Sequence, residues 1–320
     1  MLTSLPSRFG WVGLGAMGYP MANQLRQKLP AGCELWVFDV NEEATQRFVS
    51  ESEGSMPISI AQNAREVAEN SECMISIVPE GTHVKQVYLT PDTGALSANT
   101  AGKLFVDCST IDIETSLIVG DAVEKSSPDA PALFYDAPVS GGTIGAEKGS
   151  LTFMVGTSED DRLFPILKQL FSFMGTSVYP VGGRSLGLAA KLSNNYLSSM
   201  VTLATAEAMN LGMRLGIDPK VLSGCFKTSS GGNWVNSTVN PVPGVCPDAV
   251  TSRGYEGGFK IQLMKKDMGL AIEAAKRVDA RLVLADSALP AYTEASGDPR
   301  CRDRDARVIY RWLGGMEPEI

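Results

Sequence analysis

The sequence predicts an α/β fold: a doubly wound parallel sheet at the N-terminus, a long interdomain helix and an all-helical C-terminal domain. Three observations predict it. Short apolar runs alternate with helical patterns from residue 8 to residue 125. The stretch 187–216 carries small and apolar residues at three- and four-residue spacing without proline, which is typical of one helix of about eight turns. Only helical patterns follow it, so we expect the sheet and the helical part to be separate.

Length and composition support two domains. A chain of 320 residues is long for a single core, and we expect domains at residues 1–184 and 185–320. Apolar residues make up 44% of the chain and charged residues 20%, as in globular proteins. The 28 basic and 36 acidic side chains leave a net charge of −8, which argues against nucleic acid or an anionic membrane as a partner.

A glycine-rich turn follows the first apolar run, Arg8–Gly13. Its sequence is Gly13-Leu14-Gly15-Ala16-Met17-Gly18. A helical pattern comes next at Met21–Lys28, and a second strand, Cys33–Asp39, ends in an acid 21 residues after Gly18. In this context the first glycine permits a tight turn, the second admits a pyrophosphate, and the third lets helix and strand pack closely. The pattern is the fingerprint of a Rossmann-like dinucleotide-binding domain.

The acid at the end of the second strand, Asp39, favours NAD over NADP. A carboxylate there accepts hydrogen bonds from the ribose hydroxyls of NAD, whereas NADP would place a phosphate beside it. Like charges about 5 Å apart cost roughly 3 kcal/mol at an effective dielectric near 20. The next residues, Val40, Asn41 and Glu42, supply no arginine to pair with such a phosphate. We therefore expect NAD as the cofactor.

The alternation then continues to residue 125, which implies parallel strands joined by right-handed crossovers. The expected elements are helix Asn41–Glu51, strand Pro57–Ile60, helix Ala61–Asn70, strand Cys73–Val78, helix His83–Leu89, strand Leu104–Cys108 and helix Asp112–Lys125. Ligands lie at the C-terminal ends of such strands, so Val78-Pro79 and Ser109-Thr110 should line the cofactor groove. The alternative for Ser109-Thr110 is an N-cap of the following helix.

Histidine and cysteine usage restricts the chemistry. The only histidine, His83, is expected in the loop that enters a helix, with a cofactor-edge or capping role rather than proton transfer. With one histidine a zinc site has almost no ligands, and we expect no metal. The six cysteines form no Cys-x-x-Cys pair, which indicates reduced thiols in an intracellular protein. The charge-free run 192–206 is shorter than a membrane span requires.

A second glycine-rich segment follows a predicted strand at Leu133–Val139. It reads Ser140-Gly141-Gly142-Thr143, and its backbone N–H groups could form a nest for an anion such as a carboxylate. A plain glycine turn is the alternative. Strand Leu151–Val155, helix Glu159–Phe171 and strand Ser177–Val181 should close the domain, with a hinge at 182–185.

The long predicted helix carries Lys191 near its start and Asn195 one turn later on the same face. A lysine on a helix that is apolar on most sides is costly unless it has a function, although it could also extend to solvent. Further helices are expected at Pro219–Lys227, Ile261–Val278, Leu282–Ala295 and Asp303–Leu313. The stretch 229–258 has no clear period, and a loop of this length is usually functional or interfacial.

Four motifs together identify a family resemblance over nearly the whole chain. They are GLGAMG at 13–18, DAPVSGG at 136–142, GLAAKLSNN at 187–195 and KKDMGLA at 265–271. This set resembles the β-hydroxyacid dehydrogenases, relatives of 6-phosphogluconate dehydrogenase. The segments TAEAMNLGMRLGIDPKVL at 205–222, NPVPGV at 240–245 and GGF at 257–259 look closer still to its 3-hydroxyisobutyrate dehydrogenase branch.

The resemblance assigns roles to individual residues. In this family the positions that match Ser140, Gly141 and Gly142 hold the substrate carboxylate, Lys191 matches the catalytic acid/base, and Asn195 matches the residue that orients the substrate. Positions that match Val78, Pro79, Thr110 and Lys266 contact the cofactor. The chain departs from the pattern at His83, where relatives tend to have asparagine, and in the loop Gly231-Gly232-Asn233-Trp234.

The resemblance also implies an activity. It is the NAD-dependent oxidation of 3-hydroxyisobutyrate, or a close short β-hydroxyacid, to the semialdehyde in valine breakdown. It further implies a homodimer or homotetramer, located in the mitochondrial matrix if it follows the family and in the cytoplasm otherwise. Two alternatives stay open: an NADPH-dependent glyoxylate or succinic semialdehyde reductase, and a catalytically silent NAD-binding protein. A 6-phosphogluconate dehydrogenase would be markedly longer at its C-terminus.

Overall fold

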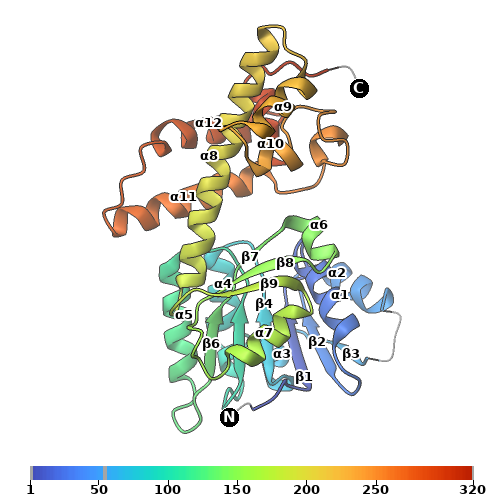
Figure 1. Cartoon of the computed structure of the whole chain (residues 1–320). Helices are drawn as coiled ribbons and strands as arrows, with labels where there is room; N and C mark the ends of the chain where they lie inside the picture. The colour runs from blue at the N-terminus through green and yellow to red at the C-terminus, as the bar shows by residue number, and fades with distance from the viewer. Residues whose placement is uncertain (1–2, 53–55, 319–320) are drawn as a thin grey trace. The chain divides into compact units, whose positions relative to one another are not determined.

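The computed structural model describes residues 3–52 and 56–318. It consists of two compact units, Met1–Lys191 and Leu192–Ile320. Helix α8, Leu186–Arg214, begins in the first unit and continues into the second, so the predicted long helix is confirmed. In Figure 1 the strands and their helices run from blue to green, and the second unit runs from yellow to red. No helix within these described ranges is long and apolar enough to cross a bilayer.

The first unit contains the predicted doubly wound sheet. Among the residues described, six parallel strands lie in the order β3-β2-β1-β4-β5-β6. They are β1 Arg8–Val12, β2 Glu34–Phe38, β3 Ile58–Ile60, β4 Cys73–Ser76, β5 Leu104–Asp107 and β6 Leu133–Asp136. The strand order reverses between β1 and β4, and in such sheets a ligand crevice forms beyond the carboxyl ends of the strands at the reversal.

Helices cover both faces of this sheet because successive side chains of a strand point to opposite faces. In β5, Leu104 and Val106 join a core with helices α1 and α2, whereas Phe105 joins a second core with α3, α4 and α5. The helices are α1 Gly18–Lys28, α2 Glu42–Ser50, α3 Ala64–Asn70, α4 Gly81–Leu89 and α5 Ile113–Lys125, and a short turn η1 spans Ala95–Ser97. Strands buried on both sides explain the near-continuous apolar runs in the sequence.

A second sheet, which the sequence did not predict, follows β6. The run expected as one strand, Leu133–Val139, is divided: β6 ends at Asp136, and β7, Val139–Ser140, belongs to a different sheet. Pro138 lies at the break, and proline lacks the N–H that a ladder needs. The sheet has the order β7-β8-β9, with β8 Leu151–Val155 and β9 Gly175–Pro180. Helix α6, Gly142–Glu147, and helix α7, Phe164–Ser172, connect its strands.

Four expected helices begin several residues later than predicted. Those expected from Ala61 and Leu282 begin at Ala64 and Ala285. The helix predicted from Glu159 begins only at Phe164, because the Asp161 side chain accepts a hydrogen bond from the Leu163 N–H and forms a turn there. The helix predicted at 303–313 is broken into η3, Ala306–Val308, and α13, Ile309–Trp312. Asp305 is the N-cap of η3, and its side chain accepts the Arg307 N–H at 3.0 Å.

The second unit is helical, as predicted. Besides α8 its elements are α9 Pro219–Thr228, α10 Trp234–Thr238, η2 Val250–Arg253, α11 Ile261–Arg277, α12 Ala285–Gly297, η3 and α13. The stretch 229–258 thus contains α10 and η2, which the sequence pattern did not reveal. Met209 of α8, Met268 of α11 and Tyr292 of α12 are fully buried in one core.

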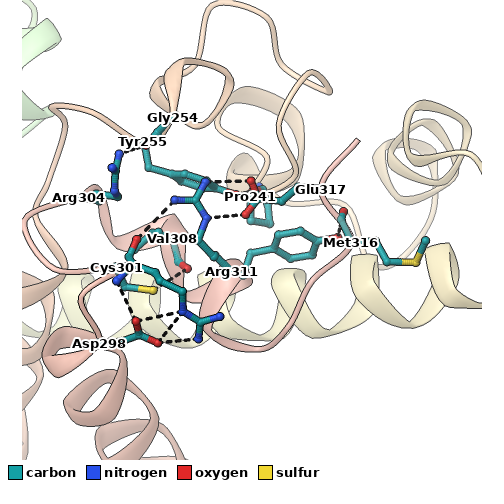
Figure 2. A network of polar contacts seen from close by, with 12 residues as sticks. Pro241, Gly254, Tyr255, Asp298, Cys301, Arg304, Val308, Arg311, Met316 and Glu317 are labelled. Atoms are coloured by element: carbon teal, nitrogen blue, oxygen red, sulfur yellow. Dashed lines mark hydrogen bonds and ion pairs between the residues drawn. The ribbon is translucent and has the colours of Figure 1, made fainter. Parts of the chain in front are cut away.

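Polar contacts tie the C-terminal segment to this core (Figure 2). The Arg311 guanidinium donates to both carboxylate oxygens of Glu317, at 2.6 and 2.9 Å, and lies 5.0 Å from the Tyr255 ring centroid. The buried Tyr255 hydroxyl donates to the Pro241 carbonyl at 2.7 Å. These contacts join the C-terminal segment to the long loop.

Candidate active site

The three glycines of the turn after β1 are explained in two different ways. Gly13 has a φ of 99°, and a Cβ there would lie 2.2 Å from the Ile77 carbonyl oxygen. A Cβ at Gly18 would lie 2.0 Å from the Gly13 carbonyl oxygen. Packing within the chain therefore requires both glycines. At Gly15 a Cβ would meet nothing within 4 Å, so only a group from outside the chain gives glycine an advantage there. This open space fits the close approach of a pyrophosphate.

Asp39, the acid after β2, accepts a hydrogen bond from the backbone of the glycine-rich turn. The Leu14 N–H donates to Asp39 Oδ2 at 2.6 Å, and the Asn41 N–H donates to Asp39 Oδ1 at 2.8 Å. Ala16, which follows Gly15 in the turn, is exposed, and Met17 is half-buried. A carboxylate oxygen can accept more than one hydrogen bond, and Asp39 therefore retains acceptor capacity for ribose hydroxyls.

The loops after β4 and β5 are joined by a serine. The Val78 N–H donates to Ser109 Oγ at 2.9 Å, and Ser109 Oγ donates to Asp107 Oδ1 at 2.7 Å. Pro79 is exposed and Thr110 is half-buried in the same two loops. The N-cap alternative for Ser109-Thr110 is wrong, because the cap of α5 is Asp112, whose side chain accepts the Thr115 N–H at 2.7 Å.

Asp107 is a buried acid that sequence reasoning did not single out. Its Oδ1 accepts from the hydroxyls of Ser76 and Ser109, each at 2.7 Å. Burial raises the pKa of Asp107 to about 6, although these hydrogen bonds oppose the shift. An acid as the last residue of an otherwise apolar strand was the available sequence signal. His83, by contrast, lies exposed within the first turn of α4 rather than in the loop before it.

The second glycine segment connects β7 to α6. Gly141 has a φ of 138° and Gly142 has a φ of 64°. Residues other than glycine rarely adopt such positive φ values. The first amides of a helix have no partner within the helix. The Ser140 hydroxyl makes no hydrogen bond to another residue in the described part of the chain. The segment therefore offers a hydroxyl and backbone N–H groups, but whether it binds a carboxylate stays a prediction.

Lys191 and Asn195 lie one turn apart on α8, as their spacing predicts. Lys191 is 8% exposed and Asn195 is 6% exposed. The alternative in which the lysine extends to solvent does not fit this burial.

Asn195 is held by a residue that the sequence analysis missed. Its Nδ2 donates to Asp267 Oδ2 at 2.6 Å, and Lys266 Nζ lies 3.1 Å from Asp267 Oδ1. Asp267 is 2% exposed in the middle of α11. The structure thus brings Asn195 and Lys266 to one carboxylate, although the resemblance had assigned them to different ligands. The sequence signal was the acid within the KKDMGLA motif.

The predicted residues therefore form three groups. One group surrounds the β1–α1 turn with Asp39 and the loop at Val78, one is the Ser140–Gly142 segment, and one comprises Asn195 with Lys266. Lys191 shares α8 with Asn195. Over residues 3–52 and 56–318, no cluster of three or more His, Cys, Asp or Glu side chains is arranged to hold a metal ion.

Two family models match the chain. One, described as the NAD binding domain of 6-phosphogluconate dehydrogenase, matches residues 8–183. The other, described as NAD-binding of NADP-dependent 3-hydroxyisobutyrate dehydrogenase, matches residues 186–313. Together with the fold and the glycine turn, these matches show that the chain belongs to the β-hydroxyacid dehydrogenase family of nicotinamide-dependent oxidoreductases.

Individual relatives confirm the family and the nicotinamide cofactor. The 3-hydroxyisobutyrate dehydrogenase of Pseudomonas aeruginosa is 41% identical over 311 residues, which cover 96% of this chain and 98% of the relative. The NAD-dependent L-serine dehydrogenase of the same organism is 39% identical, with 89% and 91% covered. A structure of Mycobacterium tuberculosis 3-hydroxyisobutyrate dehydrogenase with L-serine has a TM-score of 0.83 at 29% identity, and 96% and 99% of the two chains are covered.

Proposed function

We propose that this chain oxidises a short β-hydroxyacid with NAD and that 3-hydroxyisobutyrate is its preferred substrate. The observation that carries the proposal is the burial of Lys191 and Asn195 one turn apart on α8. Two costly polar side chains on one helix face are expected where a reacting group is held. Relatives named 3-hydroxyisobutyrate dehydrogenase support the choice of substrate. The reaction would then be the step of valine breakdown that yields the semialdehyde.

L-Serine is the second candidate substrate, since one relative is named an L-serine dehydrogenase. Both molecules carry a primary alcohol and a carboxylate, and they differ only in the group on the carbon between them. This group is a methyl in 3-hydroxyisobutyrate and an ammonium in serine. The same carboxylate site and the same proton acceptor would therefore serve either substrate. The preference between the two substrates depends on the residues around this methyl or ammonium group.

In this proposal each group has one task. Ser140 and the N–H groups at Gly141 and Gly142 bind the substrate carboxylate. Lys191 Nζ takes the proton of the substrate hydroxyl, which requires the neutral amine. Asn195 orients the substrate, and Asp267 fixes the Asn195 amide. When bound, the nicotinamide cofactor accepts a hydride from the alcohol carbon.

The cofactor contacts are assigned to residues of the loops already described. The turn Gly13–Gly18 holds the pyrophosphate, and Asp39 accepts from the adenosine ribose, which favours NAD. Val78, Pro79, Thr110 and Lys266 contact the remainder of the cofactor. We assign nucleotide binding to residues 1–184 and the helical part to 185–320, and the two family matches, which meet between residues 183 and 186, support this division.

We also propose that two copies of the chain pair through α8. Leu197 and Leu211 of α8 are 62 and 63% exposed, and Leu215, the residue after the helix, is 74% exposed. With Val201, Ala204 and Ala208 they recur alternately four and three residues apart, the seam of a left-handed helix pair. An exposed seam of this kind on a long helix fits a homodimer, alone or within a tetramer.

A substrate panel tests the proposed activity. Cofactor reduction at 340 nm is followed with 3-hydroxyisobutyrate, L-serine and their methyl esters, each with NAD and with NADP. We expect the highest kcat/KM for 3-hydroxyisobutyrate with NAD and poor turnover of the esters. Glyoxylate and succinic semialdehyde are assayed in the reverse direction with NADH and with NADPH. Preferential reduction of either compound with NADPH would support the reductase alternative, and no turnover of any compound would support the silent one.

A further inference from the structure

The N-terminus of α8 is capped by a carboxylate from a distant strand. Asp136, the last residue of β6, accepts the Ser185 N–H on Oδ1 at 2.7 Å and the Leu188 N–H on Oδ2 at 2.9 Å. The first turn of α8 itself contains no acidic residue. The two N–H groups that Asp136 accepts therefore obtain their acceptor from the sheet, 49 and 52 residues earlier in the chain.

The chain is shaped closely around this carboxylate. A Cβ at Gly156 would lie 1.9 Å from Asp136 Oδ1, and a Cβ at Gly187 would lie 2.7 Å from Oδ2. Asp136 is 1% exposed. Burial raises the pKa of Asp136, and the backbone hydrogen bonds oppose this shift. Both oxygens of this buried carboxylate accept hydrogen bonds from the start of α8. The start of the helix therefore has little freedom to slide or rotate.

Lys191 lies less than one turn beyond Leu188, so the orientation of the first turn of α8 determines where its side chain points. We propose that Asp136 is a positioning residue for Lys191, which sets the axial position and rotation of the start of α8. The inference rests on the proposed role of Lys191 as proton acceptor. It assigns a task to the aspartate of the DAPVSGG motif, to which the proposed function gives no contact with substrate or cofactor.

The test separates positioning from general stability. Asp136→Asn keeps the size of the side chain but replaces one carboxylate oxygen with an NH₂ group. This group cannot accept the hydrogen bond from the backbone N–H that faces it. Asp121→Asn is the matched control, since Asp121 pairs with Arg184 just before α8 on the surface and does not contact the helix amides. Gly156→Ala is a second variant that displaces the Asp136 carboxylate without changing it.

Four measurements are made on each protein: thermal unfolding, NAD affinity by fluorescence, steady-state kinetics, and hydrogen exchange of the segment 185–191 without cofactor. For Asp136→Asn and Gly156→Ala we expect faster exchange in that segment and a kcat about 10- to 100-fold lower, as for a reacting group displaced by about 1 Å. NAD affinity should stay within about threefold, because the loops that bind it are unchanged. Asp121→Asn should match the wild type.

A kcat within threefold of wild type in a folded Asp136→Asn variant would overturn the inference. So would loss of folding, or equal loss of kcat and NAD affinity, in both variants, since either outcome assigns Asp136 to stability alone. Lys191→Met is measured in the same series. If it keeps full kcat, the proposed role of Lys191 fails, whereas a defect in Lys191→Met without one in Asp136→Asn refutes only the positioning role.

Discussion

The Asn195 amide donates to the Asp267 carboxylate at 2.6 Å, while Lys266 Nζ lies 3.1 Å from the other oxygen of the same carboxylate. Asn194 in turn donates to Asn195 Oδ1 at 3.1 Å. One oxygen of this buried acid thus accepts from the Asn195 amide, and the other lies in an ion pair with Lys266. A fixed amide binds a substrate without first losing its own rotational freedom, which lowers the entropic cost of binding.

The first prediction concerns Asp267. Asp267→Ala should raise the KM for the hydroxyacid by about 10- to 100-fold, the worth of a hydrogen bond to a charged group, while NAD affinity changes less. Glu273→Ala is the control, because Glu273 is an exposed acid on the same helix, paired with Lys276. Equal KM values for the Asp267 variant and the control would show that Asn195 needs no such support.

The second prediction concerns Lys191. Lys191→Met keeps the length of the side chain and removes the amine, so kcat should fall by about 10²–10⁴ with NAD affinity nearly intact. Lys191→Arg should not restore it, since a guanidinium keeps its proton in this pH range. Lys168→Met, at an exposed lysine on α7, is the control. Steady-state kinetics from pH 6 to 10 measure the effect; a raised KM with preserved kcat, partly rescued by arginine, would indicate charge attraction alone.

The third prediction concerns cofactor choice. Asp39 already accepts the N–H groups of Leu14 and Asn41, so its charge is fixed beside the turn. Asp39→Asn should lower kcat/KM with NAD and raise it with NADP, because the carboxylate no longer repels the additional phosphate. The measured quantity is kcat/KM with NAD divided by kcat/KM with NADP. A wild-type ratio at or below one would contradict our interpretation of this acid.

The fourth prediction concerns assembly through α8. The double variant Leu197→Glu with Leu211→Glu places charges in the exposed seam and should convert the protein to a monomer of 34.1 kDa. Light scattering after size exclusion measures the mass. Val278→Glu, at an equally exposed apolar position after α11, should leave the mass unchanged. An assembly that persists in the double variant would place the interface elsewhere.

The fifth prediction uses the pKa of about 6 for the buried Asp107, which lies above the ordinary value of 3.8. The folded protein holds this proton more tightly than the unfolded chain does. The stability that the protonated carboxyl contributes is therefore fully present below about pH 4 and is lost as the pH rises through 6. Asp107→Asn imitates the protonated form, and its amide oxygen can keep the hydrogen bonds that converge on Oδ1.

The measurement is the unfolding free energy of wild type minus that of Asp107→Asn by urea titration at several pH values. This difference should fall by up to about 3 kcal/mol between pH 4 and pH 7. Groups common to both proteins cancel in it. A difference that is constant over this range would mean that Asp107 keeps an ordinary pKa.

Local patterns in the sequence were sufficient for the features that depend on neighbouring residues. The turn Gly13–Gly18, the acid at Asp39 and the helix that carries Lys191 and Asn195 could all be predicted, because turn geometry and helical periodicity are written in adjacent residues. The same reasoning placed Val78 and Ser109 at strand ends, and the structure adds the hydrogen bond between them.

Contacts between distant residues were decided only by the tertiary structure. Asp136 reaches the Ser185 amide across 49 residues, and Asp267 reaches Asn195 across 72. Periodicity cannot reveal such pairs, because a buried acid within an apolar run shows neither its acceptor role nor its partner. The break at Pro138, which divides one apolar run between two sheets, was hidden for the same reason. The proposed site residues are thus legible in the sequence, whereas Asp136 and Asp267 acquire their contacts only when the fold brings distant N–H donors to them.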